Sequence, residues 1–105
     1  MIDAAAQQRL GWTAALEAPR RAGVPASIAL AMRDRAGAPV TGLAVELWIR
    51  RPVGALADRR LALAEAGPGR YTAPVTLPLA GQWQFDIVAR RGADEFVYAR
   101  RVVVR

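Results

Sequence analysis

From Gly11 onward, apolar and polar residues alternate in short runs that are separated by turn-forming residues. Segments such as SIALAMR at 27–33, VELWIR at 45–50 and WQFDIV at 83–88 place apolar side chains at every second position. A period of two is the pattern of a β-strand with one buried face. Gly and Pro interrupt the runs at intervals of about ten residues, which is typical of an all-β sandwich or barrel.

The turn residues divide this region into seven predicted strands. These strands span residues 12–18, 26–33, 43–51, 59–66, 71–77, 82–90 and 95–104. Large apolar side chains share one parity in three of them: Ile28, Leu30 and Met32; Val45, Leu47 and Ile49; and Trp83, Phe85 and Ile87. Strands with one apolar face each predict two sheets packed about 10 Å apart. We therefore predict an all-β, immunoglobulin-like seven-stranded β-sandwich over residues 12–105.

The last predicted strand has a mixed pattern. Phe96 and Val104 share one parity, but Arg100 lies between them at the same parity. A β-bulge inserts one residue into a strand and so moves the following side chains to the other face. We predict such a bulge near Arg100 and Arg101.

Residues 1–11 differ in character from the rest of the chain. The segment DAAAQQRL at 3–10 combines strong helix formers with Asp3 at a capping position, and Gly11 is placed to end a helix. We predict a short N-terminal helix within 1–11, of a juxtamembrane type. No stretch of the whole chain approaches the roughly 20 apolar residues that span a bilayer, and no signal peptide is visible, so we expect the given chain to be a soluble fragment.

The composition removes several classes of function. His and Cys are both absent, which excludes thiolate chemistry, Ser-His triads and zinc or copper sites built on those side chains. The acidic residues are scattered, so no carboxylate pair is proposed for acid–base catalysis. Met32 is the single internal thioether, too few for a copper(I) site. We predict no catalytic, cofactor or metal residues, and no enzyme activity.

All 15 basic residues are Arg, and the net charge is +6. Many of these arginines occur in adjacent pairs, and neighbours on a strand point to opposite faces. No aromatic-basic motif joins them, which disfavours nucleic-acid binding. Two interpretations stay open for the pairs: solvated protection of sheet edges, and contact with anionic lipid or an acidic partner.

Four residues are candidates for an interface with a protein. Trp48 lies opposite in parity to the apolar face of its strand, with Glu46 and Arg50 on the same side. Exposed aromatic side chains beside Arg are common anchors at interfaces. Alternatively, a loop or the N-terminal helix covers Trp48. Trp12 is the fourth candidate, although its position also suits a plug for the open end of the sandwich.

Three segments carry a resemblance to a known family. They are QQRLGW at 7–12, DRAGAPVTG at 34–42, and GRY at 69–71 followed by LPLAGQW at 77–83. The last two are common in bacterial immunoglobulin-like modules, but together with the LGW sequence they resemble the FixH family over nearly the whole chain.

The resemblance implies a periplasmic domain of a protein with one transmembrane helix. It implies a non-enzymatic assembly factor for the cbb-type haem-copper cytochrome c oxidase, associated with nitrogen fixation. The implied partners are a copper-transporting P-type ATPase and oxidase subunits, with the parent protein anchored at the periplasmic side of the inner membrane. A periplasmic copper-handling or ligand-binding β-sandwich module is the alternative, and an adhesin-like structural repeat is a third possibility.

Overall fold

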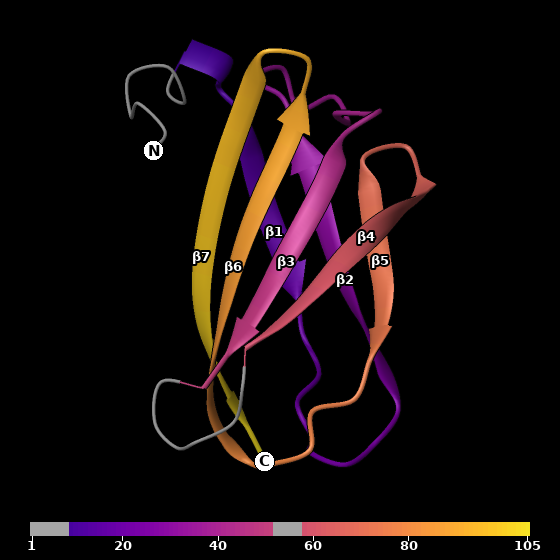
Figure 1. The fold of residues 1–105 in the computed structure, drawn as a ribbon. Helices are drawn as coiled ribbons and strands as arrows, with labels where there is room; N and C mark the ends of the chain where they lie inside the picture. Colours follow the sequence, from indigo (N-terminus) through magenta and orange to yellow (C-terminus); the bar gives the residue numbers. More distant parts are fainter. Residues whose placement is uncertain (1–8, 52–57) are drawn as a thin grey trace.

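Seven antiparallel strands form one continuous sheet in the computed structural model, which describes residues 9–51 and 58–105. Figure 1 shows the strands running along the length of the molecule. Their bounds are β1 Thr13–Glu17, β2 Ala26–Arg33, β3 Ala44–Arg50, β4 Arg59–Gly67, β5 Arg70–Val75, β6 Gly81–Arg91 and β7 Asp94–Val104. The prediction of an all-β fold is confirmed, and the predicted strand ends differ from these by at most two residues.

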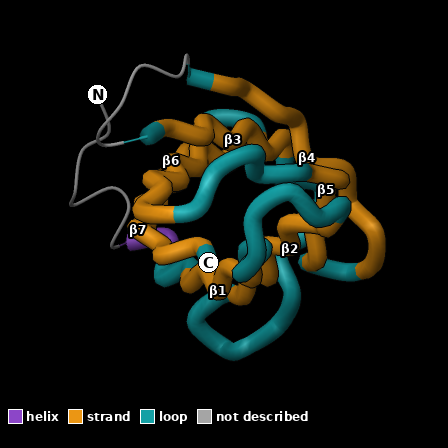
Figure 2. Tube along the Cα trace, turned by 90° about the horizontal axis from the view of Figure 1, so that it is seen from below, coloured by secondary structure: helices purple, strands orange, loops and turns teal. Residues whose placement is uncertain are grey.

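The strand order is β1-β2-β5-β4-β3-β6-β7. β4 connects the two halves of the sheet, because it pairs with β3 through Arg59–Leu63 and with β5 from Ala64 onward. A register shift between Glu65 and Gly67 bends this strand. The two separate sheets of the prediction are therefore one sheet that curls nearly into a barrel, with its strands arranged in a ring when seen along their axis (Figure 2).

The alternating side chains fill the interior of this curled sheet. Every large apolar residue assigned to an inner face in β2, β3 and β6 is buried, with at most 4% of its surface exposed. The predicted parity of these strands is thus confirmed. Tyr71 on β5 is also fully buried, and its hydroxyl donates to the Val40 carbonyl at 2.8 Å and accepts from the Leu43 amide at 3.1 Å.

β7 is regular, and the predicted bulge near Arg100 and Arg101 is wrong. Its pairing with β6 runs without a shift from Gly81 opposite Val104 to Arg91 opposite Asp94. Arg100 therefore keeps the inward parity of Phe96 and Val104. The strand tolerates this because Arg100 lies at the edge of the sheet, where its guanidinium extends out and donates to the Leu16 carbonyl at 2.6 Å.

The sheet does not close completely, because β1 and β7 are its two edge strands. Successive antiparallel pairings make these two strands parallel to each other. They are tied just beyond their ends, where the Arg105 amide donates to Arg20 and the Arg105 carbonyl accepts from Ala22, both at 2.8 Å. At the other end, the rings of Trp12 and Phe96 lie 6.3 Å apart between centroids.

The predicted helix within 1–11 falls largely outside the described residues. Arg9 and Leu10 have helical backbone conformation, and the chain then turns at Gly11, whose φ is 65°. Two residues do not make a helix, so the described part of the chain does not support that element. The segment 52–58 between the third and fourth predicted strands also lies outside the described residues except for Asp58.

Candidate interaction surface

Trp48 lies on the outer face of β3, opposite to the core. Its chain neighbours Leu47 and Ile49 are buried with 0% and 1% exposure, whereas Trp48 is half-buried. Across the sheet, Trp48 pairs with Arg60 on β4 and Asp86 on β6. The three side chains share one face because residues that are paired across antiparallel strands point to the same side.

Polar and cationic groups contact the Trp48 ring. The indole N–H donates to Glu46 Oε1 at 2.8 Å. The guanidinium carbons of Arg50 and Arg60 lie 5.5 Å and 5.7 Å from the ring centroid. Cation–π contacts at exposed sites contribute about 0.5–1 kcal/mol each, so the ring is held in one orientation at the surface.

The same arginines make ion pairs with the surrounding carboxylates. Arg50 Nε lies 3.5 Å from Asp86 Oδ2 and 3.6 Å from Asp58 Oδ2, and Arg60 Nη1 lies 3.9 Å from Glu46 Oε1. All these side chains are between about one third and two thirds exposed. Such pairs contribute about 0–1 kcal/mol each, so their main effect is to fix the positions of the charges.

The outer face continues from Trp48 toward the open edge of the sheet. Asp86 pairs with Ala99, and Val88 pairs with Val97, so the β7 side of this face is less polar. Val97 is 42% exposed, and Val103 near the end of β7 is 64% exposed. Beside Glu46 and Arg60, a hollow of about 240 Å³ also includes the exposed Ala62. The face thus combines an aromatic side chain, fixed charges and exposed valines.

The structure brings together three of the four predicted interface residues. Glu46, Trp48 and Arg50 form one cluster, which we call the Trp48 cluster together with Arg60 and Asp86. Arg60 and Asp86 were not predicted as members, because the sequence does not reveal which strands flank β3.

Trp12 does not belong to the Trp48 cluster. It is 9% exposed and packs against Phe96, with the Arg91 guanidinium 5.3 Å from its ring centroid. Trp12 is therefore a buried residue just before β1, at one end of the curled sheet.

Within 9–51 and 58–105, no group of three or more His, Cys, Asp or Glu could hold a metal ion. The same residues contain no helix that is long and apolar enough to cross a membrane. Burial raises the pKa of the Tyr71 phenol, which lies in the core and not in the Trp48 cluster.

These observations define an all-β domain with a cluster of aromatic and charged side chains on its outer face. A comparison with protein families matches the FixH family over residues 1–103. The chain belongs to the FixH family. A search among curated proteins found no match.

The solved structures with a similar fold include an engineered protein determined by crystallography, with a TM-score of 0.67 and 16% sequence identity. The similarity covers 90% of this chain and 20% of that chain. At this identity the likeness concerns the fold alone.

Proposed function

We propose that this domain is a non-enzymatic part of a membrane-anchored assembly factor for the cbb-type haem-copper cytochrome c oxidase. Membership of the FixH family supports a role related to assembly of this oxidase. The observation that carries the proposal is the Trp48 cluster, in which an aromatic ring is held at the surface between two guanidiniums. Aromatic and Arg side chains of this kind dominate binding energy at protein interfaces.

The proposed partners are oxidase subunits and a copper-transporting P-type ATPase, on the periplasmic side of the inner membrane. A pre-ordered surface loses little conformational entropy when a partner binds. The hydrogen bond from Trp48 to Glu46 and the ion pairs of Arg50 provide this order before binding. The Trp48 cluster therefore suits a role in holding partners in place.

We also propose that the fold is a variant of the immunoglobulin-like sandwich. The halves β1-β2-β5 and β3-β6-β7 face each other around one core, as the two sheets of such a sandwich do. In this variant, β4 belongs to both halves and joins them into one sheet.

The test is a double variant, Trp48→Ala with Arg50→Glu, introduced into the full-length protein in cells. Active oxidase should fall at unchanged levels of the variant protein, because both the anchor and its charge pattern are lost. The matched control is Tyr98→Ala with Arg70→Glu, which also removes one aromatic ring and reverses one charge but leaves the Trp48 cluster intact. Equal oxidase activity in the wild type and the Trp48 double variant would contradict the proposal.

The alternative of a copper-handling module makes a different prediction. Met32 is 1% exposed within the core, so its sulfur is not presented at the surface. Under the assembly-factor proposal, an anaerobic competition titration of the purified domain with copper(I) should find no tight site. Binding tighter than micromolar would favour copper handling instead.

A further inference from the structure

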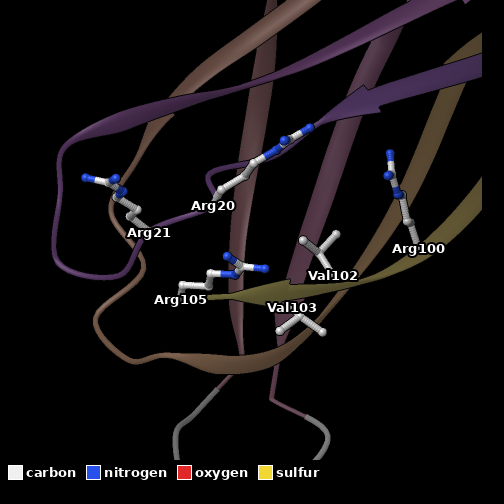
Figure 3. A pocket seen from close by; sticks show the side chains of 6 residues that line it. All are labelled: Arg20, Arg21, Arg100, Val102, Val103 and Arg105. Atoms are coloured by element: carbon white, nitrogen blue, oxygen red, sulfur yellow. The ribbon is translucent and has the colours of Figure 1, made fainter.

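Arginine side chains surround a hollow where the two edge strands of the sheet approach each other. Its volume is about 510 Å³, and it is lined by Arg20, Arg21, Arg100, Val102, Val103 and Arg105. Figure 3 shows the side chains of Arg20, Arg100 and Arg105 around Val102, with Arg21 pointing away to the other side. Among the described residues, no Asp or Glu side chain lines this hollow, which we call the arginine hollow.

The positive charge of the arginine hollow is poorly compensated. Among the described residues, Arg20, Arg21 and Arg105 make no ion pair, and Arg100 donates to a backbone carbonyl rather than to a carboxylate. A neighbouring hollow shares Arg20 and Arg100 and adds Glu17. Within the described residues, the two hollows together are lined by four arginines and by one acidic side chain, that of Glu17, so this region attracts anions.

The backbone beside the arginine hollow can also pair with an extended chain. The Arg105 amide and carbonyl point toward the segment after β1, where they bond to Arg20 and Ala22. Backbone groups alternate in direction along a strand, so those of Val103 point the same way as those of Arg105. No strand within the described residues pairs with β7 on that side. A peptide could pair with both the amide and the carbonyl of Val103, whereas a lone phosphate could accept only from the amide.

We propose that the arginine hollow binds an extended acidic segment of a protein partner. Its carboxylates would pair with Arg20, Arg100 and Arg105, since guanidinium groups bind carboxylates through two parallel hydrogen bonds. Its backbone would pair with β7 at Val103, in the manner of strand addition to a sheet edge. Val102 and Val103 would contact its apolar side chains. This inference names the chemistry of a partner and rests on the proposed partner-holding function.

The test measures binding of a fluorescein-labelled peptide of alternating Glu and Val residues by fluorescence anisotropy. The matched peptide has Gln in place of Glu. The variant Arg20→Gln with Arg100→Gln should raise the Kd of the acidic peptide about ten-fold or more, since each charge-assisted hydrogen bond lost weakens binding. Binding by the wild type should weaken with added salt.

The control variant is Arg59→Gln with Arg70→Gln. It removes the same charge and also contains one guanidinium that donates to a backbone carbonyl, from Arg59 to Thr76 at 3.2 Å. This control should bind the acidic peptide as the wild type does. Equal losses in both variants would show a nonspecific effect of net charge and overturn the proposal.

Two further outcomes would also overturn the proposal. The first is equal affinity for the Glu and Gln peptides. The second is binding of phosphatidylglycerol vesicles, but not of the acidic peptide, through Arg20 and Arg100, which would make the hollow a lipid site. These binding measurements need no oxidase, so they are independent of the cellular test of the Trp48 cluster. Either the acidic-peptide inference or the proposed function can fail while the other holds.

Discussion

The two lateral sides of the curled sheet are closed by different means. On the β4 side, backbone pairing is continuous from β3 through β4 to β5. On the β1–β7 side, closure depends on the two backbone hydrogen bonds of Arg105, the ring contact of Trp12 with Phe96, and the Arg100 side chain between them. We call these the closed side and the open side.

The closed side is reinforced by buried contacts that the open side lacks. Tyr71 on β5 ties its strand to the segment between Val40 and Leu43 through two hydrogen bonds. Gly69 in the β4–β5 turn lies against Pro39 and the Met32 carbonyl. The open side instead carries exposed arginines and a free sheet edge within the described residues. We therefore expect substitutions on the closed side to cost more unfolding free energy than substitutions on the open side.

The largest difference in unfolding free energy is expected between Gly→Ala substitutions in two hairpin turns. Gly69 on the closed side and Gly92 in the β6–β7 turn both have positive φ, at 72° and 60°. A Cβ at Gly69 would lie 2.6 Å from the Pro39 Cβ and 2.8 Å from the Met32 carbonyl oxygen, whereas one at Gly92 would meet nothing within 4 Å. Gly69→Ala should cost about 2–5 kcal/mol of unfolding free energy, and Gly92→Ala about 1–2 kcal/mol.

Urea unfolding of both glycine variants measures this difference. Gly92→Ala supplies the cost of the backbone conformation alone, so the excess in Gly69→Ala reports the close packing of the closed side. Equal losses of unfolding free energy in the two variants would contradict this prediction, because they would show that the turn at Gly69 has room to relax.

The next largest difference in unfolding free energy is expected between Tyr→Phe substitutions on opposite sides of the molecule. Tyr71→Phe leaves the Val40 carbonyl and the Leu43 amide without their buried partner, which should cost about 1–3 kcal/mol. Tyr98 on β7 is half-buried, and its hydroxyl makes no hydrogen bond with the described residues, so Tyr98→Phe should stay within about 0.5 kcal/mol. Thermal unfolding of both variants should show a clear loss for Tyr71→Phe alone.

The Tyr71 hydroxyl also predicts a dependence on alkaline pH. Burial raises its folded-state pKa above the usual 10, while the hydrogen bond from the Leu43 amide opposes this rise. Between the unfolded and folded pKa values the unfolded chain binds fewer protons, so stability is full below about pH 10 and falls as pH rises further. This part of the alkaline loss should be absent in Tyr71→Phe. An unchanged pH profile would mean that the phenol is not held in its neutral form.

The sequence predicts the interior of this protein well. In β3, Val45, Leu47 and Ile49 alternate with polar or half-buried residues, and a period of two leaves one choice of buried face. The strand order and the role of β4 could not be predicted in this way, because alternation says which face is buried but not which strands pair. For the same reason, Arg60 and Asp86 were missed as neighbours of Trp48.

Arg100 shows where the sequence pattern misleads. A charged residue at inward parity predicts a bulge if every inward position is assumed to be buried. At an edge strand beside an open side, a long side chain can keep that parity and still bring its charge to solvent. The bulge was therefore wrongly predicted at the position of the arginine hollow, where the sheet does not close.

The smallest loss of unfolding free energy is expected for a substitution of Arg100. Its size shows how strongly a side-chain contact stabilises the open side. Arg100→Gln removes the hydrogen bond to the Leu16 carbonyl and should cost about 0.5–1.5 kcal/mol, because the group is partly solvated. Arg101→Gln is the control: its side chain points to the outer face and contacts Gln84 at 3.4 Å, so its loss should stay within about 0.5 kcal/mol. Urea unfolding midpoints at constant slope measure both variants. If Arg100→Gln cost as much unfolding free energy as Tyr71→Phe, the prediction would be contradicted. Arg100 would then stabilise the open side as strongly as the buried hydrogen bonds stabilise the closed side. In that case the edge could not easily open to a partner.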